Sequence, residues 1–333
     1  MRLPRKKILI ENVNLLYIDI PKIIQLSQVD RRAKIDGYLS VIYPGSQDII
    51  FLKKGEMINA GTFVGPEKKP VSVFKALDRM KKKEDDGSVF YSEIEESLLK
   101  LLVAIFYFEP KHKNLSSKYT NIRKLFEVIQ KNKFEGFLEF EINNGLNFIE
   151  FSGEKIGGCF FCDDVEEPLS EVLSRGDDQM IIESVISMIE NHTEEVLVNI
   201  FNKVEELKMQ ISPAQIQMLE KVVNSIIDGV SKSIGMANTI DFMQLSLEET
   251  TQKHKFLKDV NLTNNVCKLD KVFTDPDLFV RSIAEWINGF VDKASLSLGD
   301  KTYEITYNCI KDMRFALEKL KFFNSSYLKS MLS

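Results

Sequence analysis

Two segments of the chain, KIDGYLSVIYPGSQDIIFLKKGEMINAGTF (residues 34–63) and KFEGFLEFEINNGLNFIEFSGEKIGGCFF (residues 133–161), are similar and lie about one hundred residues apart. They align with a single gap, which falls where Lys53 and Lys54 face Ser152. Differences in length between copies of a unit belong in turns, because turns tolerate insertions. The alignment therefore indicates an internal repeat, and this repeat decides the fold of the chain before residue 200.

The matched positions of the repeat are glycines and apolar residues. Within each copy, apolar and polar residues alternate as they do in half-buried strands. Turns rich in Pro, Gly and Asn separate these runs, and glycine adopts the positive φ of tight turns at little cost. Each copy therefore predicts a three-stranded antiparallel meander. The repeat positions are Gly37, Leu39, Gly55, Ile58 and Ala60 in the first copy, and Gly136, Leu138, Gly153 and Ile156 in the second.

Amphipathic helices are predicted on both sides of each meander. The segments IPKIIQLSQVDRRA (20–33) and NIRKLFEVIQKN (121–132) precede the meanders and carry apolar residues at helical spacing. The segments PVSVFKALDRMKKK (70–83) and EEPLSEVLSRG (166–176) follow them. Helices that cover one face of an antiparallel sheet give a small α+β module.

The segments that complete the two copies are less alike. The first copy continues with a predicted strand at GSVFYSEI (87–94) and a helix from Glu95 to about Tyr107. In the place of that strand the second copy offers QMIIESV (179–185), followed by a helix that runs on through residue 200, and it lacks a clear opening strand.

Helices dominate the chain after about residue 200. A capping box with Pro213 at the first helical position opens one helix at Ser212, and Gly235 closes it. The remaining predicted elements are a helix at about 238–256, a connection at 257–275 with a short extended piece, a helix opened by Asp275 and Pro276, and a helix from about Asp300 through Leu320. Their apolar stripes predict a helical bundle with its own core.

The sequence thus predicts an α+β fold with two tandem small modules of antiparallel meander plus helices, followed by an all-α helical bundle. The predicted domains are residues 1–110, 118–200 and 205–333.

Two of the four cysteines, Cys159 and Cys162, form a C-x-x-C motif, which is found in zinc sites and redox centres. In the alignment the first copy has Gly61 and Val64 at these positions. Residues three apart in a strand point to opposite faces of the sheet, and a redox pair favours an environment that lowers the thiol pKa. We therefore expect the two cysteines to be packing residues and predict no metal or cofactor. A metal-binding or redox protein that uses this motif, with Cys267 or Cys309, is the alternative.

No other constellation in the sequence predicts an enzyme. The chain has three histidines, His112, His192 and His254, and none stands at a metal-ligand spacing from another ligand. It has no nucleophile elbow, phosphate-binding loop or dinucleotide-binding motif. The net charge of −5 disfavours a nucleic-acid binder. We predict a non-catalytic protein.

The longest apolar run, LLKLLVAIFYF (98–108), is far shorter than a membrane span and is typical of a buried helix. The basic and apolar start of the chain stops at Glu11 without a signal-peptide core or a cleavage site. Few cysteines and no membrane insertion predict a cytoplasmic protein.

The repeat resembles the PATAN domain of bacterial signalling proteins. The resemblance rests on NLLYIDIPKIIQLSQVDRRAKIDGYLSV (14–41) and IIFLKKGEMINAGTF (49–63), which are similar to the family's opening strand, short helix, Gly-x-Leu strand and Gly-turn segment. The second copy matches through Gly136, Leu138, Gly153 and Ile156, but has Gly158 where the family has Ala.

The resemblance implies a non-catalytic role in bacterial signal transduction or motility regulation through protein-protein interaction. Its expected partners are other signalling or motility proteins. Family members are often joined to phosphoacceptor receiver domains, whereas this sequence shows no receiver pattern. We therefore expect the helical bundle to bind a partner or to mediate self-association as a homo-oligomer.

Overall fold

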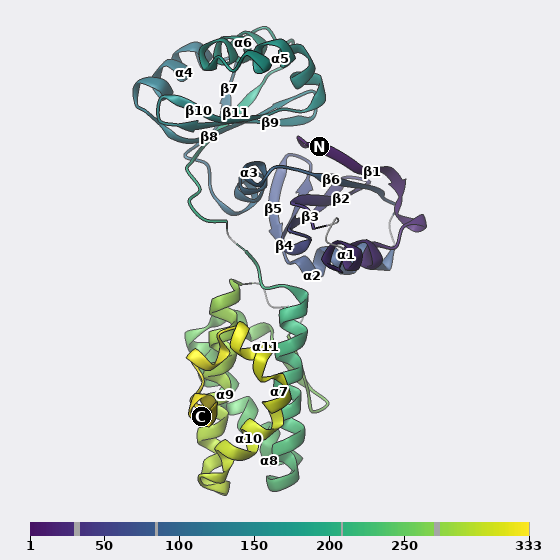
Figure 1. The fold of residues 1–333 in the computed structure, drawn as a ribbon, viewed down its shortest axis with the longest axis vertical. Helices are drawn as coiled ribbons and strands as arrows, with labels where there is room; N and C mark the ends of the chain where they lie inside the picture. The colour runs from purple at the N-terminus through teal and green to yellow at the C-terminus, as the bar shows by residue number, and fades with distance from the viewer. Residues whose placement is uncertain (30–33, 84–85, 208, 270–273, 333) are drawn as a thin grey trace. The chain divides into compact units, whose positions relative to one another are not determined.

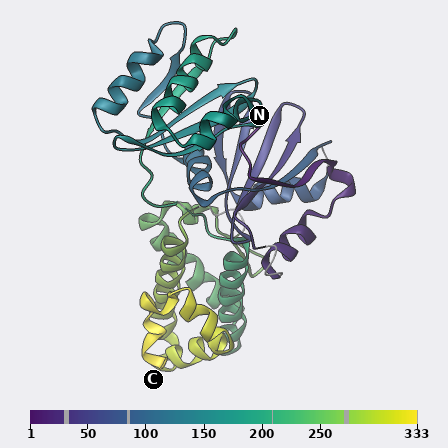
Figure 2. The same ribbon diagram turned by 45° about the horizontal axis from the view of Figure 1, so that its top comes forward.

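The computed structural model describes residues 1–29, 34–83, 86–207, 209–269 and 274–332. The chain has a mixed α+β fold with antiparallel sheets and a helical C-terminal region. It divides into two compact units (Figures 1 and 2), the first formed by Met1–Val71 with Ala76–Lys208 and the second by Ser72–Lys75 with Met209–Ser333.

The first unit contains a six-stranded sheet in the order β1-β6-β2-β3-β4-β5, in which every neighbouring pair is antiparallel. Its predicted meander is confirmed as β2, β3 and β4, and three further strands extend it. The strands are β1 (Lys7–Asn14), β2 (Gly37–Tyr43), β3 (Ser46–Lys53), β4 (Glu56–Val64), β5 (Glu67–Val71) and β6 (Ser88–Glu93). The helices of this part are η1 (Leu15–Tyr17), α1 (Ile20–Val29), α2 (Val73–Lys82) and α3 (Glu96–Tyr107).

A five-stranded sheet in the order β10-β9-β8-β11-β7 forms the rest of the first unit, and it too is antiparallel throughout. Its predicted meander is confirmed as β8, β9 and β10. The strands are β7 (His112–Ser116), β8 (Glu135–Ile142), β9 (Gly145–Ser152), β10 (Lys155–Phe160) and β11 (Leu197–Asn202). The helices are α4 (Ile122–Lys131), α5 (Asp163–Arg175) and α6 (Asp178–Glu190), which pack on one face of this sheet (Figure 1).

Helix α3 is buried by both sheets. Its residues from Leu98 to Phe106 are buried, with Lys100 as the exception. One apolar core joins them to Phe51 of the first sheet and to Phe148 of the second. A helix that is apolar on all sides must be covered on all sides, which explains its place between the two sheets (Figure 1).

Three predictions for the second copy were wrong. Residues 179–185 are helical and the helix ends at Glu190, because five apolar side chains of α6 recur at helical spacing and are buried. The segment Leu197–Asn202 is strand β11. Val198 and Phe201 lie in different cores, because residues three apart in a strand point to opposite faces of the sheet. The opening strand exists as β7, whose polar sequence HKNLS carries no alternating signal.

The predicted helix at 70–83 begins later than expected. Residues 70 and 71 belong to β5, and α2 begins at Val73. Because β5 is the last strand of its sheet, it accommodates Pro70, which has no N–H to donate to a further strand. The predicted helix at 20–33 is confirmed through Val29, and its last four residues lie outside the described ranges.

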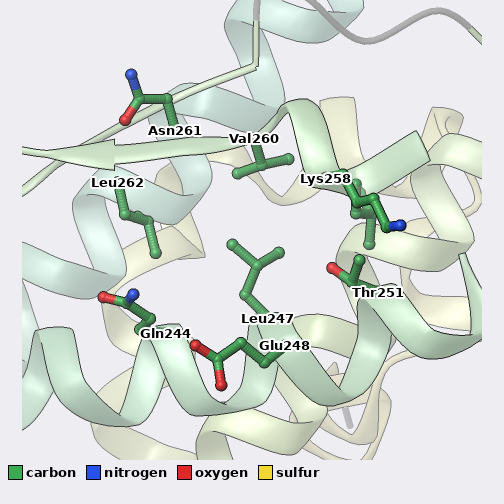
Figure 3. Close-up of a pocket in the computed structure, with 9 residues that line it drawn as sticks. Gln244, Leu247, Glu248, Thr251, Lys258, Val260, Asn261 and Leu262 are labelled. Carbon is green, nitrogen blue, oxygen red and sulfur yellow. The ribbon is translucent and has the colours of Figure 1, made fainter. Parts of the chain in front are cut away.

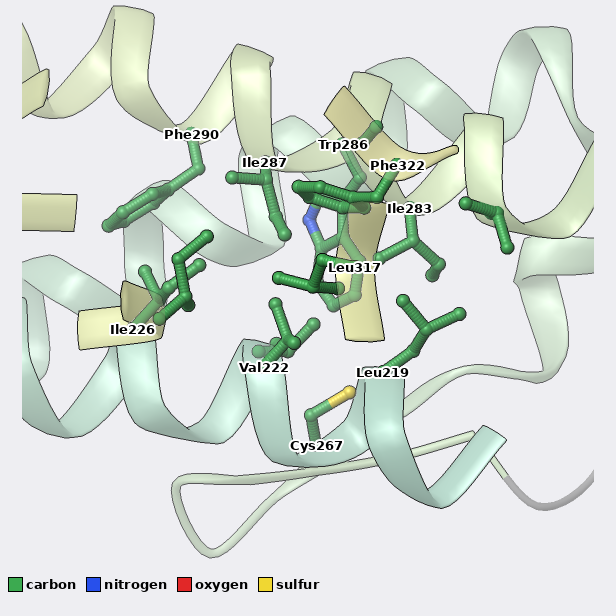
Figure 4. Packing of buried hydrophobic residues seen from close by; sticks show 14 of the residues in the cluster. Leu219, Val222, Ile226, Cys267, Ile283, Trp286, Ile287, Phe290, Leu317 and Phe322 are labelled. Atoms are coloured by element: carbon green, nitrogen blue, oxygen red, sulfur yellow. The ribbon is translucent and has the colours of Figure 1, made fainter. Parts of the chain in front are cut away.

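The second unit is a helical bundle with one apolar core (Figure 4). Its elements are α7 (Pro213–Ile234), α8 (Met236–Lys253), η3 (Lys255–Asp259), β12 (Asn261–Thr263), β13 (Val266–Lys268), α9 (Pro276–Leu298), α10 (Lys301–Ile310), η4 (Lys311–Met313), α11 (Arg314–Lys319), η5 (Phe322–Asn324) and η6 (Tyr327–Leu332). Trp286 is fully buried in this core, and its indole N–H donates to the carbonyl of Met243 at 2.9 Å.

The helix boundaries of the bundle follow the three predicted caps, but one predicted helix is broken. Ser212 and Gln215 form the capping box, and Gly235 ends α7 with φ 84°. Asp275 caps α9 by accepting from the N–H of Leu278 at 3.0 Å. The single helix predicted from Asp300 through Leu320 is wrong: the turn η4 interrupts it, and this break keeps its apolar residues in the core.

Candidate functional site

The hydrogen-bonded registers of the two meanders match position by position. Leu39 lies opposite Ile50, and Leu138 lies opposite Ile149. The next hairpins close in the same way, since Lys53 pairs with Glu56 and Ser152 pairs with Lys155. The gap assumed in the sequence alignment is therefore wrong, because both turns contain two residues between the paired ends.

This register gives Cys159 a different counterpart in the first sheet from the one that the sequence alignment assigned. Cys159 lies opposite Ile149, whereas the residue opposite Ile50 in the first sheet is Ala60. Cys159 therefore occupies the place of Ala60 and not of Gly61. A small apolar residue stands there in both sheets, which agrees with packing as the role of this cysteine.

Gly37 and Gly136 have the same structural task. A Cβ on Gly37 would lie 2.3 Å from the carbonyl oxygen of Ser92, and a Cβ on Gly136 would lie 2.2 Å from that of Phe201. Each glycine thus lets the following strand, β6 or β11, approach the first strand of its meander closely.

The second glycine of each copy, Gly55 or Gly153, has different surroundings in the two sheets. Gly55 has φ 80°, accepts a hydrogen bond from the hydroxyl of Ser27 at 3.0 Å and would clash with the carbonyl of that residue if it carried a Cβ. Gly153 has φ 70° and nothing within 4 Å of its Cβ position. The apolar repeat position Ile58 is buried and joins the core around α3, whereas Ile156 packs partly buried against the core beneath α4, α5 and α6.

The two sulfurs of the C-x-x-C motif face different surroundings. Cys159 is the second-to-last residue of strand β10 and packs against the core beneath α4, α5 and α6. Cys162 is the N-cap of α5, and its thiol donates to the carbonyl oxygen of Leu146 at 3.3 Å. The backbone N–H of Cys162 donates to Oδ1 of Asn147 at 2.9 Å.

Both thiols are held in the protonated form. Burial, with a smaller effect of Asp178, raises the pKa of Cys159 to about 12. Burial also raises the pKa of Cys162 to about 12, because the lowering effect of Arg2 is smaller than the burial effect and the carboxylates of Asp163 and Asp164 oppose it. The thiolate is the nucleophile and the metal ligand, so these environments disfavour both chemistries.

The other two cysteines lie in the bundle. Cys267 is buried, and its backbone exchanges two hydrogen bonds with the side chain of Asn224. The thiol of Cys309 donates to the carbonyl of Ile305 at 3.1 Å. Burial raises the pKa of both thiols.

The structure does not bring the histidines together. His112 lies on β7, and His192 follows α6. His254 has Nε2 at 3.0 Å from a carboxylate oxygen of Glu285. Across the ranges that the structure describes, no three His, Cys, Asp or Glu side chains are arranged to hold a metal ion.

A polar cleft of about 870 Å³ opens in the first unit, and sequence reasoning missed it. Its walls come from β5, the C-terminal end of α3, β7 and β8. Lys68 donates to Glu139 at 2.5 Å, and Asn199 donates to the second oxygen of the same carboxylate at 3.3 Å. The signal for this site is the alternation of β8, which places Glu139 and Glu141 on one face of the strand.

The remaining charges of this cleft are mixed. Lys69 and Lys113 stand exposed on its edge strands. Burial raises the pKa of Glu141, an effect that Glu139 reinforces and Lys68 opposes. The cleft thus offers both ammonium and carboxylate groups, together with the aromatic residues Tyr107 and Phe108.

The bundle has an open groove of about 450 Å³ between α8 and the segment that follows it. Leu247 and Val260 face each other across this groove, and Glu248 and Lys258 supply one carboxylate and one ammonium (Figure 3). Such a lining contains no nucleophile with a neighbouring base.

No family model matches this chain, and neither a curated protein nor a solved structure matches it. Within the described residues, none of the helices combines the length and the apolar character that crossing a membrane requires.

Proposed function

We propose that the protein is a non-catalytic adaptor of bacterial signal transduction or motility regulation, which acts in the cytoplasm through protein-protein contacts. On this proposal the first unit contains two PATAN-type modules in tandem, and the bundle provides a further contact surface or a site of self-association.

The order of the strands supports the tandem arrangement. In each sheet a strand from later in the chain, β6 or β11, pairs with the first strand of the meander, β2 or β8. The opening strand, β1 or β7, pairs with the other edge of that later strand. Thus β1, β6, β2, β3 and β4 take the places of β7, β11, β8, β9 and β10. Two copies of one module with a shared helix α3 account for this correspondence.

The single observation that carries the adaptor proposal is the charged cleft beside the edge strands β5 and β7. Its ammonium and carboxylate groups lie on the three strands β5, β7 and β8 and at Glu109, and they surround half-buried aromatic residues and the exposed Leu197. Complementary charges around apolar contacts fix the register of a protein partner and steer its approach. We assign the partner contact to this cleft.

Charge reversal at the rim of the cleft tests this assignment. The variant Lys69→Glu/Lys113→Glu changes two exposed ammonium groups, and the control Lys124→Glu/Lys155→Glu makes the same change of net charge on α4 and β10. Tagged wild-type protein and both variants are purified from the native host, and the proteins that they recover are identified by mass spectrometry. We expect the rim variant alone to lose partners. Equal recovery by all three proteins would place the contact elsewhere, and recovery of no partner by the wild type contradicts the adaptor function.

The alternative function, a metal or redox centre at Cys159 and Cys162, has weaker support. The two thiols face different surroundings, and burial raises the pKa of both. Elemental analysis of the purified protein distinguishes the two functions, because stoichiometric zinc or iron would favour the alternative.

A further inference from the structure

A second cavity in the first unit, of about 200 Å³, lies where the N-terminal segment, the first sheet and the start of α5 meet. Its polar wall consists of alternate residues of β2, Tyr38 and Ser40, together with Gln47 of β3 and Ser92 of β6. All four side chains are more than nine-tenths buried. A buried polar wall of this kind is costly unless its groups are paired.

One polar atom of this wall has no partner. The side-chain amide of Gln47, whose residue is 5 % exposed, donates through Nε2 to the hydroxyl of Ser40 at 2.7 Å. Its Oε1 atom is buried and accepts no hydrogen bond. The hydroxyl hydrogen of Ser40 remains to donate, so the pair presents one acceptor and one donor side by side. The opposite orientation of the amide also leaves one donor and one acceptor.

Apart from Met1 and the hydrogen-bonded thiol of Cys162, the rest of the lining is apolar or charge-paired. Leu3, Ile42 and Phe90 supply the apolar wall. Arg5 is bound to Asp163 at 2.8 Å and to Glu11 at 3.2 Å. Arg2 is bound to Asp164 at 2.9 Å. Because these cations already have carboxylate partners, the cavity favours a neutral ligand.

The volume limits the size of the ligand. An apolar cavity of roughly 150 Å³ holds a molecule of benzene, and this cavity is somewhat larger. We propose that it binds a neutral aromatic ring whose edge carries a hydrogen-bond donor next to an acceptor, as in an aryl amide or a nucleobase. The donor binds Oε1 of Gln47, the acceptor binds the hydroxyl of Ser40, and the ring packs on Phe90 and Ile42.

This binding would join the two sheets, because the cavity is lined both by residues of β2 and β6 and by Cys162 and Asp163, which follow β10. The adaptor would then respond to a small molecule through the contact between its two sheets. The inference rests on the cavity alone and does not require the partner cleft to be correctly assigned.

The test uses four probes and the full-length protein. Benzamide and adenine carry the donor and acceptor edge, toluene lacks it, and benzoate carries a charge in its place. Saturation-transfer NMR and ligand titration measure the binding of each. The variant Gln47→Leu removes the hydrogen-bonding edge, with Gln25→Leu on α1 as its exposed control. The variant Ile42→Phe fills the cavity, with Val64→Phe as its exposed control.

We expect benzamide or adenine to bind the wild type and both controls, and benzoate to bind more weakly than benzamide. Gln47→Leu should raise the Kd of the amide probe at least about tenfold, the effect of losing one well-formed hydrogen bond, without weakening toluene. Ile42→Phe should abolish binding of all four probes. Because Gln47→Leu removes an unpaired buried atom, it should fold, and circular dichroism checks this. The proposal is overturned if neither benzamide nor adenine binds at millimolar concentration, which would mean that the cavity holds water only. It is also overturned if Gln47→Leu binds these probes as tightly as the wild type does.

Discussion

Lys68 on the edge strand β5 donates a 2.5 Å hydrogen bond to Glu139 on β8, so that an ion pair joins the two sheets of the first unit. The side chain of Glu139 is 3 % exposed and that of Lys68 is 18 % exposed. A carboxylate so deeply buried depends on its partners for stability. The pair lies at the floor of the cleft that we assign to a protein partner.

Removing the ammonium group should destabilise the first unit strongly. Lys68→Met leaves the charge of Glu139 buried with Asn199 as its remaining partner, and we expect a loss of about 3 kcal/mol in the free energy of unfolding. Lys68→Met/Glu139→Gln removes the charge as well and should recover part of this loss. Urea denaturation followed by circular dichroism measures both. A double variant no more stable than the single variant would show that the buried charge is not the cause.

Gly61→Ala tests the packing of α3 on the first sheet. A Cβ on Gly61 would lie 2.5 Å from the ring of Phe106, and overpacking of this kind costs about 1–3 kcal/mol. Trp286, the only tryptophan, is buried in the separate core of the bundle. We therefore expect circular dichroism to show that part of this variant unfolds at a lower urea concentration than in the wild type. The midpoint of the tryptophan fluorescence change should stay the same. An equal shift of both signals contradicts the separation of the two cores.

A double-mutant cycle tests the contact between α7 and α10. A Cβ on Gly229 would lie 2.1 Å from the sulfur of Cys309. Gly229→Ala should therefore destabilise the wild type, although alanine is favoured over glycine in a helix by about 1 kcal/mol. In a Cys309→Ala background the same substitution should stabilise the bundle by about that amount. Urea unfolding curves followed by tryptophan fluorescence give the free energies of unfolding of the wild type, the two single variants and the double variant. The same effect of Gly229→Ala in both backgrounds would contradict the contact.

The meander of the first sheet and its strand β6 follow from local signals in the sequence. Alternating apolar residues and turn glycines predict β2, β3 and β4, and the match in register with β8, β9 and β10 rests on the same residues. The strand β7 gives no such signal, because it is exposed and polar. Strand β11 gives no separate signal, because its apolar residues follow closely on those of α6 and the sequence predicts one helix through both.

The alternation of β8 places Glu139 and Glu141 on one face, but it does not show what else lines the cleft, and the cavity has no such signal. An all-apolar helix such as α3 shows that it must be buried, but its sequence does not show what covers it. The partner of Lys68 and the lining around Gln47 depend on how the two sheets meet across this helix. Contacts between segments so distant in sequence leave no local periodicity from which to infer them.

The stability of the protein should fall with pH above the ordinary pKa of a thiol because of the two buried cysteines. Their pKa is about 12 in the folded protein against 9.0 for the free group. Above pH 9 the unfolded chain releases these protons while the folded chain keeps them, so alkaline pH favours unfolding. Near pH 10 the wild type should lose about two more protons on unfolding than Cys159→Ala/Cys162→Ala. Tyrosines titrate in both proteins and cancel in the comparison. Parallel slopes of unfolding free energy against pH would contradict the burial of these thiols.

The most direct test of the account is affinity purification of the wild type and of Cys159→Ala/Cys162→Ala from the native host, with mass spectrometry of the recovered proteins and elemental analysis of both baits. The adaptor function predicts that the two baits recover the same signalling or motility proteins and that neither carries a stoichiometric metal. Loss of a bound metal together with the partners in the cysteine variant would contradict it and identify the C-x-x-C motif as the functional centre.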